Sequence, residues 1–118
     1  MNTQECIDYC RLLPGASETD FGPPANILVF QLDAKRFAYF KTSEPEQWRF
    51  SLRVSPTRFI ELTDQAGIKP ARYMHRFHWI SIVNLATVDP DYLKELIHGS
   101  YQKAFTALSK KRQAELRL

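Results

Sequence analysis

The sequence has little cysteine and little glycine, and it has no long apolar run. Among its 118 residues there are two cysteines and four glycines. No apolar stretch approaches the roughly 20 residues that a membrane-spanning helix needs, and the first residues show no basic segment followed by an apolar one. These absences argue against a transmembrane helix and a secretory signal, so we expect a cytoplasmic protein that does not enter a membrane.

The scarce residues also argue against several kinds of site. With so few glycines, the chain has no glycine-rich loop for phosphate. Cys6 and Cys10 lie four residues apart in a predicted helix, where their Cβ atoms point the same way, so we expect reduced structural thiols and no disulfide. His75 and His78 are closer together than the usual spacing of zinc-binding histidines and lie far from the cysteines. The sequence therefore predicts no metal site and indicates no cofactor.

The composition is that of a folded protein with a modest positive charge. Hydrophobic residues make up 44% of the chain and charged residues 25%, which predicts one globular domain over residues 1–118. The 16 Lys and Arg residues against 13 Asp and Glu residues give a net charge of +3. A charge of this size is compatible with a polyanionic partner but does not require one.

Apolar periodicity predicts the order helix, three strands, helix, two strands, helix. The order α-β-β-β-α-β-β-α indicates an α+β two-layer sandwich, a mostly antiparallel sheet with helices on one face and the other face open. Residues 16–26 are rich in Gly, Pro, Ser and Asp and predict a loop. The predicted elements are a helix over 3–13, strands over 27–32, 36–41 and 48–54, a helix over 55–67, a hairpin of 71–74 with 77–85, a helix over 89–108 and a short helix within 109–118.

The rows of apolar side chains on these strands and helices predict one hydrophobic core. On the third strand, alternation separates apolar from basic side chains, and the long C-terminal helix carries two adjoining apolar rows. The predicted core residues are Trp48, Phe50, Leu52, Phe59, Leu93, Leu96, Ile97, Tyr101 and Phe105.

Several stretches resemble the MmcQ/YjbR family in their order and spacing. They are Tyr-Cys-Arg-Leu-Leu-Pro-Gly-Ala at 9–16, Lys-Arg-Phe-Ala at 35–38, Gly-Ile-Lys-Pro-Ala-Arg-Tyr-Met at 67–74 with His78-Trp79, and Ser100-Tyr101. The resemblance spans nearly the whole chain. It implies a two-layer α+β fold related to CyaY-like and secretion-chaperone-like domains. It also implies a DNA-binding role, by likeness to the double-wing domain of the phage transcription factor MotA, and no known enzyme activity, substrate or cofactor.

The chain departs from the family pattern in two places. Where the family often has Asn-Lys-Arg-His-Trp, residues 75–79 read His-Arg-Phe-His-Trp, so one basic residue is replaced by an aromatic one. A glycine often found before Lys35 is Ala34 here. The first change weakens the transfer of phosphate contacts to the second hairpin.

Basic residues of the strands form the first candidate binding surface. Arg49 and Arg53 alternate away from the apolar face of their strand, and Lys41 shares its parity with Tyr39 and Phe37 on the strand before. Arginines beside aromatic rings suit a phosphate backbone or unstacked bases. The alternative is a solvated strand face whose aromatic residues are shielded by a terminus or a second subunit.

Two further places supply basic candidates. Lys35 and Arg36 begin the second strand, and Arg72 and Arg76 lie near the tip of the second hairpin, which could touch a DNA groove. The alternative for the hairpin is a basic turn without function. Together the candidate nucleic-acid-binding residues are Lys35, Arg36, Lys41, Arg49, Arg53, Arg72 and Arg76, with Phe37 and Tyr39 as an aromatic surface.

No catalytic group is predicted. Ser100 and Cys10 lie on apolar helical stripes without a base partner, and we expect Ser100 to bond a carbonyl one turn earlier in its helix. The sequence therefore predicts a non-catalytic DNA-binding protein. The alternative is a peptide- or protein-binding module of secretion-chaperone-like fold, with Phe37 and Tyr39 as its anchors.

Overall fold

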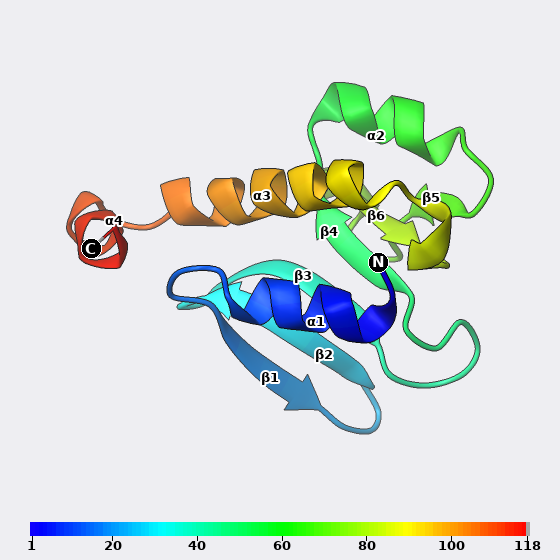
Figure 1. The fold of residues 1–118 in the computed structure, drawn as a ribbon, viewed down its shortest axis with the longest axis horizontal. Helices are drawn as coiled ribbons and strands as arrows, with labels where there is room; N and C mark the ends of the chain where they lie inside the picture. Colours follow the sequence, from blue (N-terminus) through cyan, green and yellow to red (C-terminus); the bar gives the residue numbers. More distant parts are fainter. Residues whose placement is uncertain (118) are drawn as a thin grey trace.

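A six-stranded antiparallel sheet with helices packed on it forms the fold of the computed structural model, which describes residues 1–117 (Figure 1). The strand order is β1-β2-β3-β4-β6-β5. The elements in chain order are α1 (Thr3–Arg11), β1 (Ser17–Phe21), β2 (Ile27–Leu32), β3 (Lys35–Lys41), β4 (Phe50–Arg53), α2 (Pro56–Thr63), β5 (Ile68–Pro70), β6 (Trp79–Ile82), α3 (Pro90–Thr106) and α4 (Lys110–Leu116). Two short 3-10 turns, His75–Phe77 and Leu85–Thr87, flank β6.

The predicted α+β class and order of elements are confirmed, and the structure adds one strand. β1 lies within the segment predicted as a loop, and it pairs with β2 from Ser17↔Gln31 to Phe21↔Ile27. Its side chains are mostly exposed and polar because it is an edge strand, so it lacks the apolar alternation by which strands are recognised. The pairing partner, and not the local sequence, makes this segment a strand.

The helices begin where their capping residues predict. Ser55 and Asp89 each cap a helix whose first residue is proline, and their side chains accept bonds from the backbone N–H of Arg58 and Tyr92. α2 ends at Thr63, earlier than the predicted boundary. Among residues 1–117, the helices fall short of the combined length and apolarity that crossing a membrane requires.

The second hairpin differs from the prediction. β5 is Ile68–Pro70, not 71–74, and it pairs with β6 from Ile68↔Ile82 to Pro70↔Ile80. Residues 71–78 form a loop instead, in which Tyr73 and His78 take positive φ values of 68° and 66°. Left-handed backbone cannot continue a strand, and Tyr73 stays exposed although its aromatic side chain favours strands.

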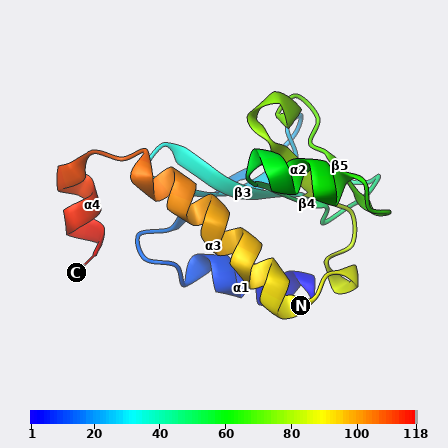
Figure 2. The ribbon, with the colours of Figure 1, turned by 90° about the horizontal axis from the view of Figure 1, so that it is seen from above.

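The core lies between the sheet and the two helices α1 and α3, which cover one face (Figure 2). The register brings alternate residues of the central strands to this face, and α2 packs beside β5 and β6. Of the predicted core residues, Trp48 is 38% exposed in the loop before β4, Phe59 is partly buried, and the others are buried. The largest buried side chains include Phe30, Phe37, Phe40, Phe50, Leu52, Ile80 and Ile82.

A bulge in the β2–β3 ladder changes which face of the sheet Phe37 occupies. Phe30 pairs with Ala38 and Gln31 with Arg36, which leaves Phe37 as the extra residue. Phe37 is fully buried and packs edge-on against Tyr101, with ring centroids 5.5 Å apart. The prediction that Phe37 and Tyr39 share an aromatic surface is therefore wrong for Phe37, because the bulge interrupts the simple alternation.

The opposite face carries a row of smaller and polar side chains. Tyr39, Ser51 and Ser81 lie side by side across β3, β4 and β6. Ser51 and Ser81 are buried, and their hydroxyl oxygens are 2.7 Å apart. Tyr39 is half-buried, and its ring stacks on that of Trp79 with the two centroids 5.6 Å apart. Tyr39 is therefore a packed residue of this face rather than a free aromatic anchor.

α4 packs against two turns that lie far from it in the sequence. Arg112 pairs with Asp33, in the turn between β2 and β3, at 3.1 Å. Gly15 has a φ of 76°, and a Cβ at this position would come within 2.5 Å of the side chain of Leu116. The predicted short helix within 109–118 is thus present as Lys110–Leu116, and residue 118 lies outside the described residues.

Candidate functional site

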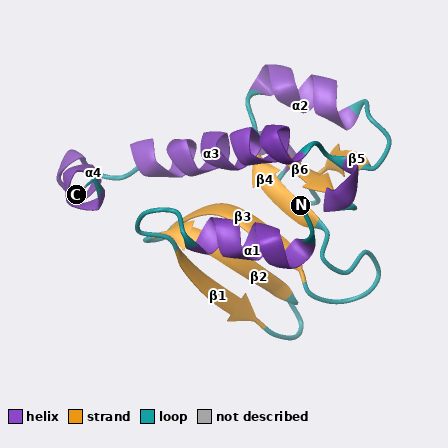
Figure 3. Cartoon of the chain, in the orientation of Figure 1, coloured by secondary structure: helices purple, strands orange, loops and turns teal. Residues whose placement is uncertain are grey.

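The topology divides the predicted basic residues between two ends of the sheet. The loops that join β1 to β2 and β3 to β4 lie at one end, whereas the turn between β2 and β3 lies at the other (Figure 3). Lys41, the last residue of β3, and Arg49, which precedes β4, are at the first end. Lys35 and Arg36, which begin β3, and Arg53, which ends antiparallel β4, are at the second.

At the second end the two central strands separate, and a helix residue bridges them. The β3–β4 pairs run from Phe40↔Phe50 to Ala38↔Leu52. Beyond these pairs, the backbone N–H of Arg53 donates to Ser100 Oγ at 3.1 Å, and the Ser100 hydroxyl donates to the carbonyl of Phe37 at 2.6 Å. Ser100 thus connects α3 to both strands. The prediction that it bonds a carbonyl of its own helix is wrong, because the bulge leaves a strand carbonyl within its reach.

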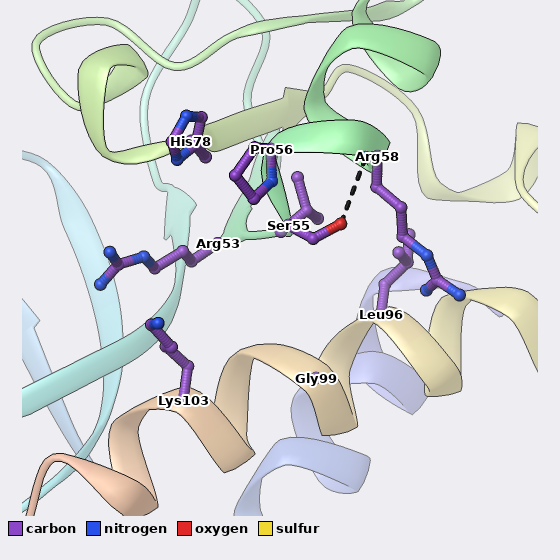
Figure 4. A pocket seen from close by; sticks show the side chains of 9 residues that line it. Arg53, Ser55, Pro56, Arg58, His78, Leu96, Gly99 and Lys103 are labelled. Carbon is purple, nitrogen blue, oxygen red and sulfur yellow. Dashed lines mark hydrogen bonds between the residues drawn. The ribbon is translucent and has the colours of Figure 1, made fainter.

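The first of two hollows at this end lies between β4, α2 and α3 and has a volume of about 480 Å³. Figure 4 shows Arg53 on one wall and Lys103 extending from α3 toward it, with His78 above. The lining residues are Arg53, Val54, Ser55, Pro56, Arg58, His78, Leu96, Gly99 and Lys103.

The second hollow adjoins the first, since Arg53 and Lys103 line both. It has a volume of about 260 Å³ and adds Lys35 and Arg36 from β3, together with Phe77 from the 71–78 loop. We call the two hollows together the basic cleft. Its basic residues are Lys35, Arg36, Arg53, Arg58 and Lys103.

The charge of the cleft is of one sign. No Asp or Glu is among the residues that line either hollow. Within residues 1–117, neither Arg53 nor Lys103 has a carboxylate at ion-pair distance. Arg58 is paired with Glu95 at 2.7 Å, and this hydrogen bond raises the pKa of Arg58. The guanidinium of Arg36 lies over the ring of Phe21, 5.4 Å from its centroid. Because Arg53 and Lys103 are unpaired cations on a concave surface, the cleft is suited to an anionic ligand.

Arg49 and Lys41, by contrast, are engaged locally. Arg49 pairs with Glu46 at 2.8 Å, and Glu46 also accepts from Lys69 at 2.8 Å. The two hydrogen bonds, first from Lys69 and then from Arg49, lower the pKa of Glu46. Lys41 donates to the carbonyl of Pro45. The structure therefore sets these two predicted residues apart from the cleft.

The remaining predicted residues, Arg72 and Arg76, lie on the 71–78 loop beside the cleft. Both are exposed, and each guanidinium lies over the ring of the next residue, Tyr73 at 4.9 Å and Phe77 at 5.0 Å. Because Phe77 lines the second hollow, the loop forms part of the cleft's border.

Lys103 and Arg58 are cleft residues that the sequence did not identify. Lys103 follows Gly99 by four residues on α3, so the two share a face where a small residue leaves room for a ligand. This spacing is visible in the sequence. The spacing indicates a binding surface only because β4 lies opposite this face of α3, and that arrangement is visible only in the fold.

The residues considered as possible nucleophiles, Ser100 and Cys10, are buried and have structural roles. Ser100 is buried with both hydrogen bonds made to the backbone. Cys6 and Cys10 are free and buried in the core, and the hydrogen bond between them, together with burial, raises the pKa of Cys10, which keeps its thiol protonated. In the described part of the chain, His, Cys, Asp and Glu form no group of three or more that could hold a metal ion. The chemistry that the site offers is therefore the binding of anions by the basic side chains of the cleft.

Solved structures of other proteins have the same fold. The chain is similar to the Deinococcus radiodurans protein DR2400, a DUF419 domain, with 28% identity, a TM-score of 0.83, and coverage of 99% of this chain and 88% of that one. It has the fold of a Pseudomonas syringae protein at 23% identity and a TM-score of 0.69, over 88% of this chain and 99% of the other. No curated protein matches significantly. The YjbR family model matches residues 11–103, which include the sheet and the basic residues of the cleft, and the chain therefore belongs to the MmcQ/YjbR family.

Proposed function

We propose that this protein is a non-catalytic DNA-binding protein that holds the phosphate backbone in the basic cleft. One observation carries the proposal: two adjoining hollows are lined by Lys35, Arg36, Arg53 and Lys103, together with Arg58, which is paired with Glu95, and no Asp or Glu is among their lining residues. Cations of this kind supply most of the affinity of proteins for nucleic acids, because each phosphate contact releases condensed counterions.

The geometry also favours a long ligand over a small one. Arg53 and Lys103 stand where the two hollows meet, so a ligand that passes from one hollow to the other contacts both side chains. Arginine offers a planar fork of donors to phosphate oxygens, and lysine a mobile point charge. A chain of phosphates can use both hollows at once.

The residues predicted to anchor a peptide, Phe37 and Tyr39, are not free to do so, which weakens the alternative of a peptide-binding module. Phe37 is fully buried, and Tyr39 is stacked against Trp79 on the sheet. The resemblance of the family to the double-wing domain supports the nucleic-acid proposal.

The test is a binding titration of the protein against a fluorescent DNA duplex at low and at moderate salt. We expect the logarithm of the binding constant to fall with the logarithm of the salt concentration by about 0.9 per phosphate neutralised. The double variant Arg53→Gln/Lys103→Gln should bind more weakly and lower that slope by roughly two phosphate contacts. The matched control is Lys110→Gln/Lys111→Gln, which removes the same charge from exposed positions on α4.

Two results would count against the proposal. If the parent protein shows no salt-dependent binding to duplex or single-stranded DNA, the cleft does not hold nucleic acid. If the α4 control weakens binding as much as the cleft variant, net charge rather than the cleft accounts for the attraction.

A further inference from the structure

The 71–78 loop exposes two aromatic rings beside the basic cleft. Tyr73 is 76% exposed and Phe77 is 43% exposed. Large aromatic side chains are usually buried, because their rings are largely apolar. Two exposed rings in one short loop point to a ligand that covers them.

The backbone of the loop holds the ring of Tyr73 outward. Tyr73 has a φ of 68°, a conformation that is disfavoured for a bulky side chain. The loop is nevertheless fixed by its own hydrogen bonds: the N–H of Met74 donates to the carbonyl of Ala71 at 3.2 Å, and that of Phe77 to the carbonyl of Met74 at 3.1 Å. The exposure of Tyr73 is therefore built into the loop's backbone.

Each ring is paired with a cation from the residue before it. Arg72 lies 4.9 Å from the centroid of Tyr73, and Arg76 lies 5.0 Å from that of Phe77. An arginine on one face of a ring leaves the other face for a flat partner. It also adds positive charge where a phosphate would follow that partner. A nucleotide combines a flat base with a phosphate, so this pair of groups suits nucleotides.

The loop adjoins the cleft at Phe77, while Tyr73 lies on the same loop outside the two hollows. Phe77 lines the same hollow as Arg36, Arg53 and Lys103, so a strand whose phosphates occupy the hollow brings its bases beside the ring. In a duplex the bases are stacked and paired, and their faces are not available to protein rings. In a single strand they are available.

We infer that the preferred ligand is single-stranded DNA, with its phosphates in the basic cleft and its bases stacked on Tyr73 and Phe77. This inference rests on the proposed function and specifies the form of its ligand. The loop contributes selectivity for unpaired bases, and the cleft contributes the affinity for phosphates that all nucleic acids share.

The experiment compares three fluorescent probes of equal length, about 12 nucleotides, within the range of single-strand binding sites. They are an oligothymidine, a strand of the same number of phosphates without bases, and a duplex. The parent protein should bind oligothymidine on the order of tenfold more tightly than the other two. The variant Tyr73→Leu/Phe77→Leu should lose that preference, so that it binds oligothymidine and the abasic strand with similar affinity. Tyr73→Phe, which retains the ring, should keep the preference.

The outcomes separate this inference from the proposal beneath it. If the probes bind equally, or the leucine variant keeps the preference for oligothymidine, the stacking role is wrong, while DNA binding in the cleft stands if Arg53→Gln/Lys103→Gln weakens every probe. If no probe binds at low salt, both fail. If an oligoglutamate of matched charge binds as tightly and loses affinity in the leucine variant, the loop recognises an acidic peptide and the inference is overturned. Tyr73→Leu alone, at a highly exposed position, repeats the comparison should the double variant unfold.

Discussion

Ser100 holds Arg53 at the edge of the cleft: the backbone N–H of Arg53 donates to the Ser100 hydroxyl at 3.1 Å, and that hydroxyl donates to the carbonyl of Phe37 at 2.6 Å. The hydroxyl takes the place of the backbone pair that β3 and β4 do not make beyond Ala38↔Leu52. The side chain of Ser100 on α3 thus links β3 and β4 at the end of the sheet where the cleft lies.

Replacing Ser100 by Ala should destabilise the protein. The change leaves a strand N–H and a buried carbonyl without a partner, which costs about 1–3 kcal/mol. Urea denaturation measures it. Ser17→Ala, at an exposed position of β1, serves as the control. Equal stability of the Ser100→Ala variant and the parent would show that the strands close on each other without the hydroxyl.

Replacing Phe37 by Ala should cost far more stability than the same change at Tyr39. Phe37 is fully buried against Phe30 and Tyr101, and deleting a buried phenylalanine costs about 3–5 kcal/mol. Tyr39 is half-buried, so its removal leaves a smaller gap. Thermal or chemical denaturation of both variants tests the bulge, because an unbulged β3 would make the two residues equivalent.

The ion pairs of Glu46 should make stability depend on acid pH. Hydrogen bonds from Lys69 and Arg49 lower the pKa of Glu46 in the folded state. A carboxyl with a lowered pKa stabilises the fold above its unfolded pKa, and this contribution is lost as the pH falls through the folded value. The effect is small because the side chains are partly exposed. Urea denaturation across acid pH should show it in the parent and not in Glu46→Gln.

Arg49 and Arg53 should behave differently although they occupy equivalent positions in the alternating pattern. Arg53→Gln should weaken DNA binding, because Arg53 lines both hollows. Arg49→Gln should leave DNA binding unchanged, because Arg49 pairs with Glu46 at the other end of the central strands. Titration of both variants at one low salt concentration checks this. A larger loss for Arg49→Gln would place the binding surface elsewhere.

Local signals in the sequence are sufficient for much of the fold. Ser55 and Asp89 mark helix starts because a capping side chain followed by proline acts within a few residues. Phe50 and Leu52 mark a buried strand face by alternation, and both are buried. β1 and the bulge at Phe37 could not be predicted this way, since each depends on how β2 pairs with its neighbour.

The candidate site was predictable only in part, for the same reason. Arg53, Lys35 and Arg36 were identified as basic strand residues, but their meeting depends on the antiparallel order of β3 and β4. Lys103 joins them because Ser100 fixes α3 against these strands. Contacts between residues far apart in the sequence leave no local pattern.

The bridge made by Ser100 has a consequence for the thermodynamics of ligand binding. One hydroxyl anchors both strand ends, so the backbone at Arg53 and at the bulge beside Arg36 is already ordered in the free protein. For the proposed anionic ligand the cleft would be preorganised: the entropy lost in placing its backbone is lost on folding, and association would have to immobilise only the basic side chains and the ligand itself.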